Sequence, residues 1–395
     1  MRILLFSNWL PPIKSGSSFY TSSLARSLLE RGHEVVVVSL DWGREYIPDE
    51  GEPFTVYRLP VIPIPKLPVF YNLKLMGFAC TPGNHRRLGS LVKKHGIQII
   101  HHVNHIFDTT FLTANVARTA GIPIVGSITT PIQHQHPVMQ KLMSVADLLT
   151  VGQFGVKRWD GIVSLDRTVH DYVGRIYGRK TQQRSVVIPF GVRAESMSDY
   201  TDRSVPRAER PQILMVGHIH PFRNPVNLVR ALPRVIKEIP EVRLVLAGRV
   251  DIDEPVRVAR ELGLGEDRIK FLGETAHGEI VRLMKESHVY ASWATGPFRS
   301  LGTAPMEAML CGIPVINDFP EDLFGEGKPK NGENILLVDS SDVRSVADTI
   351  IKLLKDRPFR ERIGSGGRCF VLEHLGWDKI TEQMENFYSE MIARR

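Results

Sequence analysis

Cysteines are scarce in this sequence, and long hydrophobic runs are missing. The three cysteines, Cys80, Cys311 and Cys369, lie far apart without Cys-x-x-Cys spacing. This argues against a disulfide framework or a thiolate zinc site and fits a reducing compartment. No stretch approaches the roughly 18 apolar residues of a transmembrane helix, and the N-terminal MRILLFSNWLPP is too short an apolar run for a signal peptide. We therefore expect a cytoplasmic protein.

Composition and length predict a folded protein of two domains. The chain has 395 residues, of which 43% are hydrophobic and 24% charged, close to globular averages. A domain typically takes about 150 residues, so two domains of ordinary size are the first expectation.

Positive charge is concentrated in the first half of the chain. Residues 1–190 carry 21 Lys and Arg against 12 Asp and Glu, a net +9, whereas residues 191–395 carry 29 against 31, a net −2. Such asymmetry suits an anionic partner such as a phospholipid surface, a lipid phosphate or nucleic acid, although a modest excess also aids solubility. Nucleic acid is not expected, because aromatic platforms and a recognisable reading module are lacking.

Two series of short apolar runs alternate with helix-length segments. Runs of Val and Ile without polar alternation indicate strands buried on both faces, hence parallel sheets covered by helices. In the first half these runs lie at 2–7, 34–39, 97–101, 122–127 and 185–188. In the second half they lie at 212–216, 243–247, 269–272, 287–290, 313–316 and 335–338.

The architecture therefore repeats, with a polar, Pro-containing linker at about 192–211. Two such doubly wound α/β domains would create a cleft at the carboxyl ends of both sheets, where ligands of open α/β sheets bind.

Two segments of the first half suggest contact with an acceptor or a membrane. Residues 60–82 interleave five prolines with Phe, Tyr, Leu and Met, which fits a membrane-dipping or acceptor-side loop, or a Pro-rich crossover packed on its own domain. Residues 85–96, HRRLGSLVKKHG, predict a basic amphipathic helix that suits a membrane surface or is a solvated face.

One ordered string points to a known family. Residues 300–317 read SLGTAPMEAMLCGIPVIN, which resembles the nucleotide-sugar site of the family 4 glycosyltransferases, retaining enzymes of the GT-B fold. Other segments agree in order: LARSLLERGHEVVVVS, VIPFGV, VGHIHPFRN, LVLAGRV and GENILLV. The resemblance covers nearly the whole chain.

The resemblance implies an architecture and an activity. The fold would be two Rossmann-like domains facing each other across a cleft: an acceptor-side domain at 1–191, a donor domain at 212–374, and a last helix at about 375–395 that packs back on the first domain. The enzyme would transfer a sugar from a nucleotide sugar to a lipid-linked or glycan acceptor in polysaccharide or glycoconjugate biosynthesis. It would be cytoplasmic or peripheral at the inner face of the plasma membrane.

The resemblance also assigns donor-binding residues. Glu307 matches the carboxylate that accepts hydrogen bonds from ribose hydroxyls, although an acid near a helix N-terminus is also favoured by the helix dipole. Gly302 and Thr303 are expected to open that helix, with free N–H groups facing phosphate or sugar oxygens. Ser300 and Leu301 complete this donor-binding segment.

Arg299 is a departure from the family pattern. A second Glu, which touches the sugar hydroxyls, ordinarily stands eight positions before Glu307, where this chain has Arg299. Arg299 could recognise an anionic sugar or strengthen phosphate binding. The alternative is a diverged donor site.

Diphosphate binding is assigned to the segment VGHIHPFRN. The family commonly has Arg and Lys at the positions of His218 and Arg223. A guanidinium at Arg223 keeps its charge at neutral pH and can clamp phosphate oxygens. His218 could make leaving-group stabilisation depend on pH, or be a surface residue.

The first domain shows a second departure. Gly16 matches the second glycine of the family's phosphate-approaching loop, with Ser15 in place of the first, and Thr129 stands where the family has an active-site His. His105 is a candidate to substitute for that His. Further imidazoles follow the same strands, at His101, His102, His134 and His136.

A metal site is not expected, because no carboxylate or thiolate cluster accompanies these histidines and GT-B enzymes usually bind nucleotide without metal. We expect no cofactor beyond the nucleotide sugar itself.

The mechanism that the resemblance implies needs no enzyme nucleophile, because the acceptor attacks on the face that the diphosphate leaves. Because Arg299 and Thr129 replace two expected residues, one alternative hypothesis stays open: the chain is a degenerate GT-B protein that binds nucleotide sugar or a partner without transferring the sugar.

Overall fold

The computed structural model divides the chain into two compact units. It describes residues 1–13, 15–43, 53–65, 75–129, 131–134, 136–192, 200, 206–296, 299–325 and 328–395. Unit 1 comprises Met1–Gly191 and Trp377–Arg395, and unit 2 comprises Val192–Gly376. Most of the expected linker at 192–211 lies outside the described residues.

Unit 1 is built on a parallel sheet. Its strand order is β3-β2-β1-β6-β7-β8-β9, and each neighbouring pair is parallel. Strand β1 pairs Ile3 with Val35 of β2 on one side and with Ile99 of β6 on the other. The strands are β1 (Arg2–Ser7), β2 (Glu34–Asp41), β3 (Thr55–Pro60), β6 (Ile99–Val103), β7 (Ile124–Ile128), β8 (Gly161–Ser164) and β9 (Ser185–Val187).

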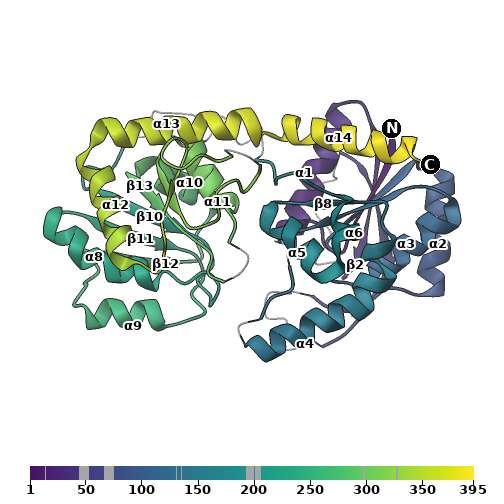
Figure 1. Cartoon of the computed structure of the whole chain (residues 1–395), viewed down its shortest axis with the longest axis horizontal. Helices are drawn as coiled ribbons and strands as arrows, with labels where there is room; N and C mark the ends of the chain where they lie inside the picture. Colours follow the sequence, from purple (N-terminus) through teal and green to yellow (C-terminus); the bar gives the residue numbers. More distant parts are fainter. Residues whose placement is uncertain are drawn as a thin grey trace. The chain divides into compact units, whose positions relative to one another are not determined.

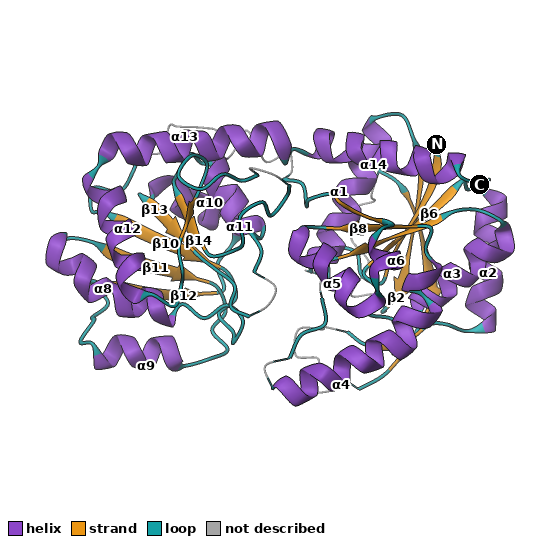
Figure 2. Cartoon of the chain, viewed as in Figure 1, coloured by secondary structure: helices purple, strands orange, loops and turns teal. Residues whose placement is uncertain are grey.

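Helices cover both faces of this sheet (Figure 2). The helices of unit 1 are α1 (Gly16–Glu30), α2 (Pro82–Lys94), α3 (Thr109–Ala120), α4 (Pro137–Asp147), α5 (Arg167–Tyr177), α6 (Arg179–Gln182) and α14 (Trp377–Ala393). A π-helical turn, Leu148–Gly152, continues α4, and a short 3-10 turn follows at Val156–Arg158. The last helix, α14, buries Ile380, Met384 and Phe387 in the core of unit 1 beside Leu24 of α1.

The Pro-rich segment at 60–82 is described in part. A two-stranded antiparallel ribbon joins β4 (Ile62–Pro63) to β5 (Gly77–Phe78), while 66–74 lies outside the described residues. The helix expected at 85–96 is α2, which exposes Arg86 and Arg87 and buries Leu88. Whether either segment meets a membrane stays a prediction.

Unit 2 repeats the architecture with a six-stranded parallel sheet. Its order is β12-β11-β10-β13-β14-β15, and Figure 1 labels β12, β11, β10 and β13 of this series. The strands are β10 (Gln212–Val216), β11 (Arg243–Ala247), β12 (Ile269–Gly273), β13 (Val289–Ala291), β14 (Val315–Asn317) and β15 (Leu336–Leu337). The helices are α8 (Val226–Glu238), α9 (Glu254–Glu261), α10 (His277–Glu286), α11 (Thr303–Leu310), α12 (Val343–Lys355) and α13 (Arg357–His374).

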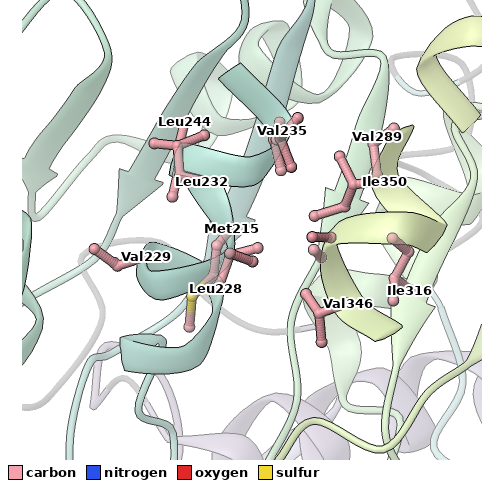
Figure 3. Packing of buried hydrophobic residues seen from close by; sticks show 14 of the residues in the cluster. Met215, Leu228, Val229, Leu232, Val235, Leu244, Val289, Ile316, Val346 and Ile350 are labelled. Atoms are coloured by element: carbon pink, nitrogen blue, oxygen red, sulfur yellow. The ribbon is translucent and has the colours of Figure 1, made fainter. Parts of the chain in front are cut away.

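The unit 2 core joins α8 and α12 to the sheet. Leu232 of α8 and Ile350 of α12 are buried in one cluster with Met215 of β10 and Ile316 of β14 (Figure 3). The apolar residues of α8 recur at helical spacing, and this buried face fixes the sheet on which the site is built.

The predicted class of two doubly wound α/β domains is confirmed, and the seven-stranded sheet of unit 1 contains two strands, β3 and β8, that the sequence did not predict. β3, at the sheet edge, has exposed residues at both ends and only one fully buried residue, and β8 has only 4 residues. Neither gives the continuous apolar run by which the other strands were recognised.

Candidate active site

Two glycines bring the loop after β10 back over the end of that strand. Gly217 has φ 140° and Gly248 has φ 146°, a backbone conformation that residues other than Gly rarely adopt. A Cβ on Gly248 would lie 2.2 Å from the carbonyl oxygen of Gly217, and one on Gly217 would lie 2.7 Å from Nη1 of Arg223. The loop therefore places the Arg223 guanidinium directly against the end of β10.

Arg223 is a cation without a carboxylate partner among the described residues. Its backbone closes a tight turn with His220, in which the Arg223 N–H donates to the His220 carbonyl at 2.8 Å. The side chain lines a pocket with Ser292 and Asn317. A half-buried guanidinium in such a pocket is suited to bind an anion.

His218 is held by an acid outside that pocket. Its Nε2 lies 2.5 Å from Oδ2 of Asp251, and Arg249 donates to Oδ1 of the same carboxylate at 2.8 Å. Hydrogen bonding from Arg249, followed by the charge of His218, lowers the pKa of Asp251, with partial desolvation opposing them. In this conformation the imidazole is engaged by Asp251, so its role toward a diphosphate stays a prediction.

The N-terminus of α11 faces the same pocket as Arg223. The helix begins after Gly302, which has φ 73° and no side chain, so its N-cap residue accepts no hydrogen bond from the N–H groups of the first turn. Ser300, Leu301 and Thr303 line the pocket, while the side chain of Leu301 is itself buried. The helix dipole adds a partial positive charge here.

Asn317 contributes a further donor that the sequence analysis missed. The residue is 1% exposed, its Oδ1 accepts from the Asp318 N–H at 2.7 Å, and its Nδ2 has no partner in the described part of the chain. Asn317 ends β14 and lines the pocket. Its position at the carboxyl end of a parallel strand was the available signal.

The pocket therefore collects hydrogen-bond donors. Arg223, the Asn317 amide and the first turn of α11 converge on it. A buried amide donor without a partner is costly unless a ligand or water satisfies it. The arrangement is suited to phosphate oxygens.

Glu307 lies one turn into α11 and is largely buried. Burial raises the pKa of its carboxyl, while the charge of His277 and a hydrogen bond from Tyr200 lower it. The Tyr200 hydroxyl lies 2.9 Å from Nε2 of His277. Tyr200 and His277, which the sequence analysis did not select, thus surround the carboxylate expected to meet ribose hydroxyls.

Arg299 is not a free cation. Its Nη1 lies 2.5 Å from Oδ1 of Asp318, whose side chain is 8% exposed, and Oδ2 of Asp318 accepts from the Ser340 N–H at 3.0 Å. The guanidinium thus neutralises a buried acid at the end of β14. Its expected role toward the sugar or phosphate stays a prediction.

The unit 1 candidates are less clearly grouped. Gly16 is the first residue of α1, and a Cβ there would meet no atom within 4 Å, so the backbone is open to approach. Ser15 caps the helix, accepting from the Ser18 N–H at 3.1 Å. Thr129 follows β7 and its buried hydroxyl has no partner among the described residues.

His105 lies in the interior of unit 1. It is 0% exposed, both ring nitrogens lack hydrogen-bond partners among the described residues, and Nε2 lies 4.0 Å from Oδ1 of Asp147. Burial lowers the pKa of His105, opposed by the charge of Asp147. Its catalytic role stays a prediction, and a substrate would reach the ring only after rearrangement.

His101 and His102 stabilise the interior of unit 1. His101 bridges the Tyr388 hydroxyl of α14 at 2.5 Å and the Ser127 hydroxyl at 2.6 Å. His102 contacts the Thr113 hydroxyl at 3.1 Å. Burial lowers both pKa values from 6.5 to about 3, so both rings are neutral at pH 7.

In the described ranges, no group of three or more His, Cys, Asp or Glu side chains is arranged to hold a metal ion. None of the helices in those ranges combines the length and apolar character needed to cross a membrane.

Two family models match successive parts of the chain. Residues 14–196 match the family described as Glycosyltransferase Family 4, and residues 198–369 match the family described as Glycosyl transferases group 1. The chain belongs to the family 4, group 1 glycosyltransferases. It is thus a glycosyltransferase that uses a nucleotide sugar.

Curated relatives of this glycosyltransferase match over the full length. It is 26% identical over 396 residues to the phosphatidyl-myo-inositol mannosyltransferase of Mycobacterium leprae, covering 100% of this chain and 97% of the relative. The enzyme of the same name from Mycolicibacterium smegmatis is 25% identical over 401 residues, covering 98% and 93%.

Solved structures confirm the GT-B fold of the glycosyltransferase. Anabaena HepE in complex with UDP has a TM-score of 0.75 at 18% identity, covering 99% of this chain and 100% of that one. Sucrose-phosphate synthase from Thermosynechococcus elongatus has a TM-score of 0.71 at 21% identity, covering both chains fully. At these identities the likeness supports the fold alone.

Proposed function

We propose that this glycosyltransferase transfers a sugar from a nucleoside diphosphate sugar to a lipid-linked acceptor, with retention of the anomeric configuration. The observation that carries the proposal is the donor set around one unit 2 pocket: Arg223, the N-terminus of α11 and the Asn317 amide, which has no partner among the described residues. Phosphate oxygens are the acceptors that such a set satisfies. Glu307, also on α11, would accept from the ribose hydroxyls.

The pocket would stabilise the leaving group. In the proposed step the acceptor oxygen bonds to the anomeric carbon on the face from which the diphosphate departs, and the acceptor proton passes to a phosphate oxygen. Arg223 and the N–H groups of α11 would bear the charge that develops on the diphosphate, without a metal ion or an enzyme nucleophile. Positioning and exclusion of water would supply the rest of the acceleration.

The acceptor is proposed from the full-length relatives. Both are named as acting on phosphatidyl-myo-inositol, a membrane lipid. The basic excess of residues 1–190 and the exposed Arg86 and Arg87 of α2 suit an anionic membrane surface. The enzyme would work as a peripheral protein at the inner face of the plasma membrane, in glycolipid or polysaccharide biosynthesis.

The experiment presents donors and acceptors together. Purified protein is incubated with GDP-mannose, UDP-glucose or other common nucleotide sugars and with vesicles that contain phosphatidylinositol, and both released nucleotide and glycolipid are measured. The anomeric configuration of the product is read by NMR. Transfer with inversion would overturn the retaining mechanism, and turnover confined to water-soluble glycans would overturn the lipid acceptor. Activity that a chelator abolishes and a divalent cation restores would overturn metal independence.

A further inference from the structure

Helix α4 carries its apolar side chains on the outside. Val138 is 70% exposed, Leu142 60% and Val145 45%, and Leu149 in the following turn is 62% exposed. These residues follow one another at spacings of four, three and four, so they form one stripe along the helix. We call these four residues the α4 stripe. Figure 1 shows α4 at the periphery of unit 1.

The opposite face of α4 is anchored by a polar contact. Asp147 is the fully buried residue of the helix, and its Oδ2 accepts from the hydroxyls of Tyr172 at 2.7 Å and Tyr177 at 2.6 Å. Both tyrosines belong to α5. The helix is thus fixed to its unit by a carboxylate, and the face that would ordinarily pack on a core is left toward solvent.

Within residues 136–159, the segment that carries the stripe, the exposed charged side chains are basic. Lys141 is exposed on α4 beside the stripe, and Lys157 and Arg158 follow. Between residues 136 and 159 the sequence has one acid, Asp147, and it is buried. Phe154, 51% exposed, lies beneath the Arg158 guanidinium, which is 5.7 Å from the ring centre.

We propose that the α4 stripe docks on an anionic phospholipid bilayer. The four apolar side chains would enter the boundary between headgroups and acyl chains, while Lys141 and Arg158 would meet lipid phosphates. Charge complementarity distinguishes this occupant from a second copy of the chain, because two stripes facing each other would bring Lys141 and Arg158 of both copies together. The link to catalysis rests on the proposed lipid acceptor, whereas the docking itself does not.

The test measures binding of the full chain to vesicles. Wild type and the double variant Leu142→Ser with Leu149→Ser are sedimented with vesicles of phosphatidylglycerol and phosphatidylcholine. A matched control, Leu262→Ser with Leu272→Ser, removes two exposed leucines from unit 2, each 42% exposed. We expect the stripe variant to partition at least tenfold more weakly and the control to behave as wild type. Equal partitioning of all three proteins would overturn the proposal.

Two further readouts separate the alternatives. Leu142→Trp should shift its fluorescence to shorter wavelength with phosphatidylglycerol vesicles, and an unchanged spectrum would count against insertion. Light scattering without lipid should show the same mass for wild type and stripe variant; a lower mass in the variant would assign the stripe to an interface between copies instead. Retained nucleotide binding in the stripe variant would show that a loss of docking is independent of the proposed donor site.

Discussion

Arg299 and Asp318 form an ion pair at the edge of the candidate donor pocket, with Nη1 and Oδ1 2.5 Å apart. The acid is buried and also accepts from the Ser340 N–H. The pair ties the segment before α11 to the end of β14, which carries the pocket amide of Asn317. An arginine here therefore has a structural use that is independent of the donor sugar.

Removing this arginine should destabilise unit 2 moderately. Arg299→Ala leaves Asp318 with a backbone partner but without its cation, and because Arg299 is 40% exposed we expect a loss of only about 1 kcal/mol in the free energy of unfolding. Urea unfolding measures it. Arg344→Ala, which removes an exposed pair on α12, is the control. If Arg299→Ala instead left stability unchanged and altered the choice of donor sugar, that result would support the hypothesis that Arg299 recognises the sugar.

Glu307 should determine nucleotide affinity. Glu307→Gln keeps the shape of the side chain but removes the charge that strengthens hydrogen bonds to ribose hydroxyls, so affinity for the nucleoside diphosphate should fall about 10- to 100-fold. Calorimetric titration measures this, with the exposed Glu279→Gln as control. Equal affinity in Glu307→Gln and wild type would remove the ribose assignment.

The buried histidines of unit 1 should make stability fall in acid. The folded-state pKa values of His101 and His102 lie at about 3, below the 6.5 of an exposed imidazole. Between these values the unfolded chain binds the protons, so the free energy of unfolding decreases as pH falls from about 6.5 toward 3, by up to about 1.4 kcal/mol per pH unit for each ring. The variant His102→Gln should take up about one proton fewer on unfolding than wild type, so the pH slope of its unfolding free energy should be smaller by up to about 1.4 kcal/mol per pH unit. An unchanged slope in that variant would contradict the argument.

The carboxylate under α4 should depend on its tyrosines. Tyr172→Phe removes one of the two hydroxyls that donate to Asp147, and we expect a loss of about 2 kcal/mol in unfolding free energy, because a buried charge loses a hydrogen bond. Tyr57→Phe, which removes a half-buried hydroxyl bonded to His95, should cost less. Equal losses of unfolding free energy in the two variants would show that the hydrogen bond to Asp147 stabilises the protein no more than the half-buried one between Tyr57 and His95.

Strands with continuous apolar runs could be predicted from the sequence, whereas contacts between distant loops could not. The runs at 212–216 and 243–247 coincide with β10 and β11 because buried parallel strands need apolar residues on both faces. The pairing of Arg299 with Asp318 depends on how two strand ends approach in space, and nothing in the local sequence encodes it. Asn317 lies at a strand end that the sequence predicts, but only the packed structure shows that its amide Nδ2 has no partner among the described residues.

The sequence likewise did not show that α4 exposes its apolar face and buries its polar face. Its apolar spacing reads as an ordinary amphipathic helix, and the period alone gives no sign of which face is buried. Only the contacts of Asp147 with Tyr172 and Tyr177 show that the polar side is the inner one.

The central claim is that the Arg223 pocket binds the donor diphosphate, and one titration tests it most directly. UDP, GDP and ADP are titrated by calorimetry into wild type, Arg223→Ala and the control Arg230→Ala, whose exposed side chain contacts Asn227 on α8. We predict that wild type and control bind one nucleoside diphosphate alike, and that Arg223→Ala binds it at least about tenfold more weakly, since a charge-assisted contact is lost. Equal affinity in all three proteins would contradict the account.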